Sequence, residues 1–290
     1  MWMIFALCSA GFAGATAILA KIGIKDTDSN LATAIRTVVI VIFSWLMVFI
    51  VGSQGGIYRI EAKTLLFLVL SGIATGASWL CYFAALRRGE VSRVAAIDKS
   101  SIIFTMLFAF LVLGEDLGVR KLISIALIII GTYLMLERKK GEVENEGEKR
   151  TGKAWMLYAF GSAIFASLTA VLGKIGIDGV ESNLGTAIRT VVVLMMAWIM
   201  VFVSKKQYEI KKIDKKSWLF ICLSGITTGL SWLCYYRALQ MGQAGIVVMI
   251  DKLSIVVTAG FSFFILKERM TRKSVLGILL ITGGILWLLI

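Results

Sequence analysis

The chain has 290 residues, of which 58% are hydrophobic and only 17% are charged, and its mean hydropathy is +0.86. A soluble domain is roughly half apolar and about one quarter charged, so this composition excludes an ordinary soluble protein and indicates an integral membrane protein. The formal net charge of +13 does not indicate nucleic-acid binding, because the basic residues lie in short connections between apolar stretches, where they are typical of a topology signal. We therefore expect the lipid bilayer, and no nucleic acid, as a partner.

Apolar stretches long enough to cross a bilayer recur along the whole chain. A hydrocarbon core of roughly 30 Å takes about 20 helical residues at about 1.5 Å each. The stretches lie at approximately 2–20, 31–51, 64–85, 94–113, 122–136, 154–173, 184–204, 218–239, 246–266 and 274–290. The sequence thus predicts an all-α integral membrane protein with ten transmembrane helices.

An internal repeat relates the two halves of the chain. Shifted by 153 positions, residues 2–136 align with residues 155–289 without a gap, and about half of the aligned positions are identical. Each half holds an odd number of predicted helices, so the second half must enter the membrane from the opposite side. The sequence predicts two five-helix inverted-topology repeats, over 1–137 and 154–290, joined by a charged linker over 138–153.

Loop charge predicts the orientation in the membrane. The connections near 21–25, 87–93, 137–153, 205–216 and 267–273 hold about 21 lysines and arginines, against about 6 in the connections on the other side. Because positively charged loops stay in the cytoplasm, we expect a multi-pass protein of a bacterial or archaeal cytoplasmic membrane with both termini outside.

Two Asp-Lys pairs lie at equivalent positions of the repeat, inside otherwise apolar stretches. Asp98 and Lys99 belong to the fourth predicted helix, and Asp251 and Lys252 to the ninth. Charge inside a bilayer is costly and marks either function or a deliberate pairing. Adjacent helical residues project about 100° apart, so each aspartate should face surroundings different from those of its lysine. Two interpretations stay open: ion-pair struts between the halves, or carboxylates that titrate and bind a proton or a cationic group.

Polar side chains at helical spacing accompany these pairs in the third and eighth predicted helices. They are Ser71, Thr75, Ser78, Tyr82, Ser224, Thr228, Ser231 and Tyr235. Trp79 and Trp232 lie beside these stripes and are interpreted either as core or interface anchors or as walls of a cavity. The two stripes are expected to line one cavity.

Arg36 and Arg189 occupy equivalent positions in the first two turns of the second and seventh predicted helices. A long basic side chain at this depth is expected to snorkel to the membrane surface, with contact to a carboxylate as the alternative. If they contact a carboxylate instead, both arginines belong to the candidate site.

Enzymatic chemistry has no support in the sequence. The chain lacks histidine, and its four cysteines do not have metal-ligand spacing. No arrangement of a nucleophile with a base is apparent. We expect no enzyme activity, no metal and no cofactor.

Short motifs carry a resemblance to a known family. They are YFAAL at 82–86, LGE at 113–115, LIIIGTYLM at 127–135, YYRAL at 235–239, LKE at 266–268 and LLITGGILWL at 279–288. Through them the chain resembles, over essentially its whole length, the EamA-type branch of the drug/metabolite transporter superfamily. The resemblance implies a ten-helix secondary transporter of small metabolites, amino acids or drug-like solutes. It also implies a central cavity lined mainly by the third, fourth, eighth and ninth helices, with protons as a candidate coupling ion.

The chain departs from that family in containing no proline. Family members generally carry proline in the fourth and ninth helices, where this chain has Ala96 and Met249. Because proline kinks a helix, we expect both helices to be straighter here. One alternative hypothesis is therefore an engineered, proline-free scaffold that folds without transporting. Another is a proton-coupled antiporter of cationic drugs, which the lack of a carboxylate in the first and sixth predicted helices disfavours.

Overall fold

The computed structural model describes residues 1–23, 27–86, 88, 94, 97–98, 100–136, 154–265 and 271–289. This part of the chain is helical and contains no strand. Its α-helices are α1 (Trp2–Gly23), α2 (Ser29–Val51), α3 (Ala62–Leu86), α5 (Ser101–Leu113), α6 (Val119–Leu136), α7 (Ala154–Ile177), α8 (Ser182–Val203), α9 (Lys215–Met241), α10 (Ala244–Asp251), α11 (Leu253–Ile265) and α12 (Arg272–Leu289). Two 3₁₀ helices are η1 (Ser53–Arg59) and η2 (Gln207–Lys212).

Several of these helices have the length and composition of membrane spans. Within the described residues, seven stretches are long and apolar enough to cross a bilayer, counting α10 together with the first part of α11 as one, and α5 is a shorter apolar helix. The expectation of an all-α membrane protein is confirmed. The number of ten crossings stays a prediction.

Acidic caps at equivalent positions start the helices that follow α1 and α7. The Asp28 carboxylate accepts hydrogen bonds from the backbone N–H groups of Asn30 (3.0 Å) and Leu31 (3.1 Å) at the start of α2. Glu181, 153 positions later, accepts one from the N–H of Leu184 (3.0 Å) at the start of α8. Such caps satisfy backbone donors that the helix leaves unpaired, which explains why α2 and α8 begin where they do.

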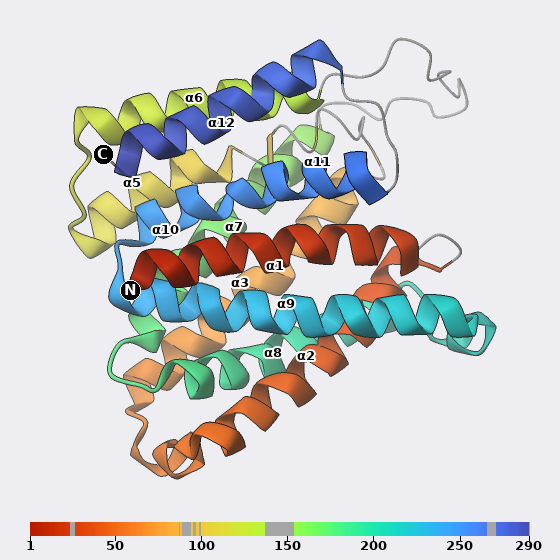
Figure 1. The fold of residues 1–290 in the computed structure, drawn as a ribbon. Coiled ribbons are helices and arrows are strands. Elements are labelled where there is room, and N and C mark those ends of the chain that lie inside the picture. Colours follow the sequence, from red (N-terminus) through yellow and green to blue (C-terminus); the bar gives the residue numbers. More distant parts are fainter. Residues whose placement is uncertain are drawn as a thin grey trace.

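The two halves of the chain interleave rather than pack as separate bodies. Helix α1 packs along α9, and α3 packs along α7, in the middle of the bundle (Figure 1). The α6–α12 pair covers one edge and the α2–α8 pair lies at the other. Each of these pairs joins one helix from each half, so the core forms only when both halves are present.

Glycines allow two of these inter-half contacts at equivalent positions. A Cβ atom on Gly72 of α3 would lie 2.7 Å from Cβ of Val192 in α8. A Cβ atom on Gly225 of α9 would lie 2.8 Å from Cβ of Val39 in α2. Since real Cβ contacts are longer, only glycine permits this close helix approach, as at the small-residue interfaces of membrane helices.

The predicted ninth helix is interrupted at its Asp-Lys pair. Helix α10 ends at Asp251, Lys252 forms a turn, and α11 begins at Leu253. Hydrogen bonds between residues three apart, as in a 3₁₀ helix, form here. The N–H of Lys252 donates to the carbonyl of Met249 (3.1 Å), and the N–H of Ile255 donates to the carbonyl of Lys252 (3.0 Å). A local turn of this kind forms here without proline. The expectation that the ninth helix is straighter stays a prediction. Ala96, the equivalent position in the first half, lies outside the described residues.

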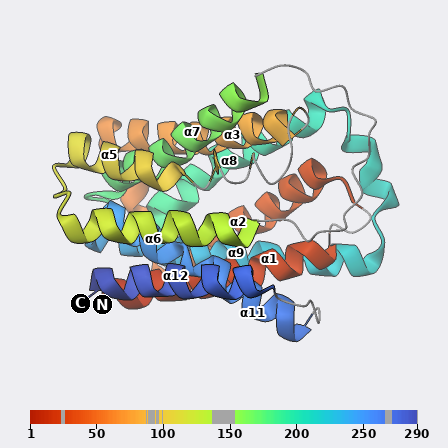
Figure 2. The same ribbon diagram turned by 90° about the horizontal axis from the view of Figure 1, so that it is seen from above.

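The two ends of the chain lie at the same end of the bundle. The start of α1 and the end of α12 both lie at this end in the two views (Figures 1 and 2). A chain that crosses a membrane an even number of times has both of its ends on the same side. Which side of the membrane this end faces stays a prediction from loop charge.

Candidate functional site

A cavity of about 360 Å³ lies in the middle of the bundle, between helices of both halves. Polar, charged and aromatic side chains form much of its wall. The lining residues are Ser9, Ala13, Thr75, Ser78, Trp79, Ala166, Thr169, Arg189, Ser231, Trp232, Tyr235, Tyr236 and Asp251. They come from α1, α3, α7, α8, α9 and α10. We refer to this space as the central cavity.

Arg189 of α8 is the most deeply buried charge of the central cavity, with 1% of its surface exposed. Its Nη2 donates a hydrogen bond to Oγ1 of Thr75 (2.6 Å), and its Nε donates to Oγ of Ser71 (3.3 Å). The guanidinium carbon also lies 4.4 Å from the ring centroid of Tyr236 and 5.2 Å from that of Trp232. Hydroxyl groups and aromatic rings, all neutral, thus hold this cation in place.

The hydroxyls that hold Arg189 are oriented by further hydrogen bonds. The Ser71 hydroxyl donates to the carbonyl of Thr169 (2.8 Å), and the Thr75 hydroxyl donates to the carbonyl of Ser71 (3.0 Å). Because each proton is engaged by a carbonyl, the lone pairs of both oxygens are available to the guanidinium. The arginine is therefore held in a prepared setting. The expectation that Arg189 snorkels to the membrane surface was wrong.

Arg36, the repeat equivalent of Arg189, has a different environment. It is absent from the lining of the central cavity, and its Nε is buried without a hydrogen-bond partner among the described residues. Among the described residues, no hydrogen bond joins Arg36 to Ser224 or Thr228, the equivalents of Ser71 and Thr75. The Ser224 hydroxyl donates to the carbonyl of Ile221 in its own helix (2.8 Å), whereas the Ser71 hydroxyl donates to Thr169 of α7. The repeat in sequence therefore does not produce two equivalent arginine sites.

The structure brings most of the other predicted site residues to one place. Those that line the central cavity with Arg189 are Ser78, Trp79, Ser231, Trp232, Tyr235 and Asp251. Tyr82, Asp98 and Lys252 are half-buried but do not line it. Lys99 lies outside the described residues. Asp251 thus lines the central cavity, whereas Lys252, the next residue, does not.

Asp98 belongs to a short chain of hydrogen bonds beside the cavity. The Ser162 hydroxyl of α7 donates to Oδ1 of Asp98 (2.7 Å), and the Ser78 hydroxyl of α3 donates to the carbonyl of Ser162 (3.1 Å). The equivalent serines of the other half repeat this contact, since the Ser231 hydroxyl donates to the carbonyl of Ser9 (3.0 Å). Serines thus link the two central helix pairs at equivalent points.

Helices α1 and α7 contribute more to the cavity than the sequence indicated. The expected lining came mainly from the third, fourth, eighth and ninth helices, but α1 supplies Ser9 and α7 supplies Thr169, and no described residue of the fourth lines it. The available signal was that Ser9 and Thr169 have polar repeat equivalents, Ser162 and Thr16. Tyr236 was also missed, because its equivalent is Phe83 and the repeat does not mark it.

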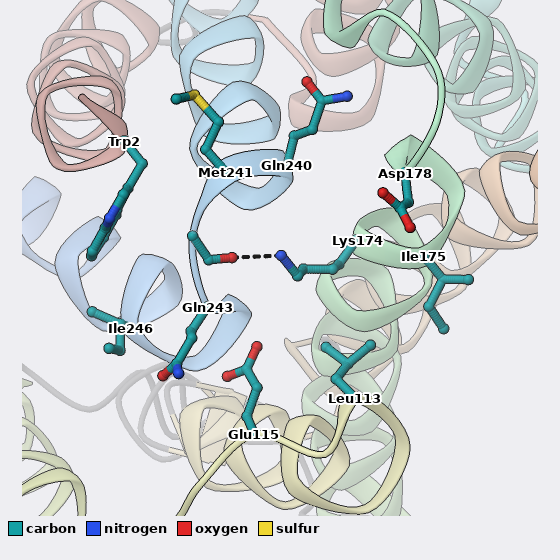
Figure 3. A pocket seen from close by; sticks show the side chains of 11 residues that line it. Trp2, Leu113, Glu115, Lys174, Ile175, Asp178, Gln240, Met241, Gln243 and Ile246 are labelled. Atoms are coloured by element: carbon teal, nitrogen blue, oxygen red, sulfur yellow. Dashed lines mark hydrogen bonds between the residues drawn. The ribbon is translucent and has the colours of Figure 1, made fainter.

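A second pocket, of about 650 Å³, opens at the end of the bundle where the termini lie. It is lined by Trp2, Leu113, Glu115, Lys174, Ile175, Asp178, Gln240, Met241, Gly242, Gln243 and Ile246 (Figure 3). Figure 3 shows Lys174, on α7, and Glu115, in the connection that follows α5, approaching the α9–α10 connection. The pocket surrounds the point where α9 ends and α10 begins.

Three charged residues hold the α9–α10 connection, and we call them the clamp. The buried Glu115 carboxylate accepts hydrogen bonds from the N–H groups of Ala244 (2.5 Å) and Gly245 (3.0 Å), which caps α10. Lys174 donates to the carbonyls of Leu239 (2.6 Å) and Gly242 (2.5 Å). The third member, Lys121, donates to Oε1 of Gln243 (2.8 Å). Charge-assisted bonds therefore satisfy carbonyl groups at the end of α9 and N–H groups at the start of α10.

The clamp was missed in the sequence, although its signal was present. Glu115 is the glutamate of the LGE motif, and the LKE motif repeats it as Glu268, which lies outside the described residues. Lys174 has the repeat equivalent Lys21. Charges that recur in both halves near predicted helix ends were thus visible, but only the folded chain brings Glu115 and Lys174 to the same connection.

Comparisons with known proteins agree with this architecture. An uncharacterized transporter in cobO 3′region from a Sinorhizobium species is 45% identical over 134 residues, 46% of this chain and 95% of that protein. An uncharacterized transporter from Archaeoglobus fulgidus is 26% identical over 269 residues, 92% of this chain and 90% of that protein. A crystal structure of a protein with 14% sequence identity superposes with a TM-score of 0.76, covering 99% of this chain and 95% of the other, and so shares the fold.

The family comparison covers both halves separately. The EamA-like transporter family matches residues 1–137 and residues 153–290. The resemblance seen in the short motifs is thereby confirmed. The chain belongs to the EamA-like transporter family and is a membrane transporter.

Proposed function

We propose that this protein is a secondary transporter that moves a small solute by alternating access around the central cavity. One observation carries the proposal: a cavity of about 360 Å³ lies among helices of both halves and holds charged, hydroxyl and aromatic side chains. Sites for small molecules commonly measure about 300–1,000 Å³ and combine apolar walls with a few polar groups. Transporters built from repeats place such sites between the repeats.

The pairing of helices supports an inverted-repeat arrangement of ten helices. The α1–α9 pair is the repeat equivalent of the α7–α3 pair, and both flank the central cavity. The caps at Asp28 and Glu181 and the glycine contacts at Gly72 and Gly225 are also equivalent in the two halves. Two structurally similar units that rock against one another provide the alternating access that we propose.

The clamp supplies a contact that such a transporter has to break. It ties the α9–α10 connection to α7 and to the segment that follows α5, at the end where the termini lie. Because loop charge predicts that this end faces outward, we propose that release of the clamp opens the outer side of the cavity. The titration of Asp98 and Asp251 is the candidate for proton coupling, with ion-pair struts as the competing role.

The antiporter of cationic drugs receives less support than a transporter of other solutes. The central cavity contains the permanently charged guanidinium of Arg189, and a cationic solute has to approach it. Like charges at close range in a medium of low dielectric constant repel strongly. A cavity that selects cations would not be expected to keep an arginine in its wall.

Flux through proteoliposomes tests the proposed function. The purified chain is reconstituted, and uptake of labelled small metabolites, carboxylic acids and amino acids is compared with that of protein-free liposomes, with and without a pH gradient. We expect saturable uptake of at least one solute and a reduced or pH-independent rate in Asp98→Asn or Asp251→Asn. Normal transport by both variants, combined with lower melting temperatures, would make the aspartates struts.

The same assay tests the scaffold alternative. If the parent chain carries no solute, while the double variant Ala96→Pro and Met249→Pro does, the proline-free chain is a folded scaffold that has lost transport. Flux by the parent chain contradicts the scaffold hypothesis directly. Far-ultraviolet circular dichroism and size-exclusion profiles of each variant establish that the comparison is made between folded proteins.

A further inference from the structure

We infer that the central cavity binds solutes through an anionic group, of which a carboxylate is the best match, docked on the guanidinium of Arg189. This inference rests on the proposed function and specifies the chemical class of the solute. It starts from an imbalance at Arg189. A buried cation is costly unless it is paired, and within the described part of the chain no carboxylate lies within ion-pair distance of this guanidinium.

The hydrogen bonds of Arg189 leave one edge of its planar guanidinium group available for a ligand. Nε and Nη2 donate to Ser71 and Thr75, whereas no hydrogen bond to a described residue engages Nη1. Nη1 is also not completely enclosed by protein atoms. Since Arg189 lines the central cavity, its remaining donors are available there. A guanidinium presents parallel N–H groups that match the two oxygens of a carboxylate.

The surroundings hold the guanidinium ready for such a ligand. The rings of Tyr236 and Trp232 lie on the guanidinium at 4.4 and 5.2 Å, and the oriented hydroxyls of Ser71 and Thr75 restrict its rotation. A side chain fixed before binding loses little entropy when the ligand arrives. The aromatic walls also offer apolar surface to the remainder of the solute.

The repeat explains why one such site is expected rather than two. Arg36 does not line the central cavity, and among the described residues no hydrogen bond joins it to Ser224 or Thr228, the equivalents of Ser71 and Thr75. Position 83 is phenylalanine where position 236 is tyrosine. Of these two repeat-equivalent arginines, Arg189 is therefore the one that lines the cavity in the part of the chain that the structure describes, and Arg36 provides a matched control for it.

The test measures binding of acids and their neutral amides to the purified full-length chain in detergent by isothermal titration calorimetry. The probes are acetate and acetamide, phenylacetate and phenylacetamide, and succinate and succinamide. In the wild-type protein we expect at least one acid to bind about tenfold or more tightly than its amide, because the amide cannot form a charge-assisted pair. In Arg189→Gln the preference should fall to about threefold or less.

The controls separate charge, geometry and folding. Arg36→Gln should keep the wild-type preference, and Arg189→Lys should retain part of it, because lysine keeps the charge but loses the fork. If Arg189→Gln does not fold, Thr75→Val reduces the preference without removing the charge. The wild-type comparison of acid with amide needs no variant and remains decisive in every case.

Two results would overturn the inference. One is a wild-type protein in which no acid of the panel binds more tightly than its amide, including the case in which no acid binds. The other is a preference that survives in Arg189→Gln. These results are distinct from failure of the proposed function. A chain that binds acids but carries no solute across liposomes would support the anion site and contradict the transport role. A chain that transports a solute but does not prefer acids would support the transport role and contradict the anion site.

Discussion

The guanidinium of Arg189 lies over the ring of Tyr236, with its central carbon 4.4 Å from the ring centroid. The two residues come from α8 and α9, and both are almost completely buried. Because the face of an aromatic ring carries negative potential, this contact compensates part of the cost of burying the cation. The position of the guanidinium in the central cavity therefore depends on how α8 packs against α9.

Substitution of Tyr236 tests that contact. Tyr236→Phe keeps the aromatic face, whereas Tyr236→Leu removes it, so the leucine variant should lose about 1–2 kcal/mol more free energy of unfolding. Reversible denaturation in mixed micelles measures this difference. Equal losses in the two variants would show that the ring contributes only volume.

Removal of the clamp glutamate should loosen the start of α10. Glu115→Ala leaves the N–H groups of Ala244 and Gly245 without their carboxylate, and each unpaired buried donor costs about 1–3 kcal/mol. We expect faster hydrogen exchange at residues 242–247, measured by mass spectrometry. Asp116→Ala, which removes an exposed neighbouring carboxylate, is the control and should leave that exchange unchanged. The same exchange rate in both variants would contradict a role for Glu115 in holding α10.

The close contacts of α3 with α8 and of α9 with α2 predict sensitivity to a single methyl group. Gly72→Ala and Gly225→Ala each place a Cβ within 2.8 Å of a valine Cβ on the neighbouring helix. Overpacking of this kind costs about 1–3 kcal/mol, so both variants should melt at lower temperature. Gly11→Ala meets no atom within 4 Å and should melt at or above the wild-type temperature, since alanine favours a helix. Tolerance of alanine at both close contacts would contradict the observed helix packing.

The serines beside Asp98 should differ in their contribution to stability. Ser162→Ala removes the hydroxyl that donates to the carboxylate at 2.7 Å, whereas Ser78→Ala removes a hydroxyl that donates to a neutral carbonyl at 3.1 Å. Hydrogen bonds to charged groups contribute about 1.5–3 kcal/mol and neutral ones about 0.5–1.5 kcal/mol. The Ser162 variant should therefore lose more free energy of unfolding in the same assay. The opposite order would mean that the carboxylate at position 98 is neutral or is held by other groups.

Much of the fold could be predicted from local pattern. The apolar stretches, their length and the acidic residues before α2 and α8 determine which segments become membrane helices and where they start. The motifs YFAAL and LGE also identified the family. These features depend on near neighbours in the chain and on the thickness of the bilayer, so no tertiary information was needed.

The site could be predicted only in part. Ser78, Trp79, Trp232 and Asp251 were proposed from polar residues in apolar helices, and the structure places them around one cavity. Whether they bind or couple is not tested by geometry and stays a prediction. The turn at Lys252 was not foreseen, because it arises from hydrogen bonds between residues three apart and not from a proline that the sequence would show.

The sequence by itself determined that the chain is a helical membrane transporter with two related halves in its sequence. Only the tertiary structure decided that Arg189 lies in the central cavity while Arg36 does not, and that Glu115 caps α10. The physical reason is that sequence identity between the halves specifies similar helices but not similar partners. A serine hydroxyl that donates to one carbonyl or another changes the surroundings of each arginine once the halves interleave.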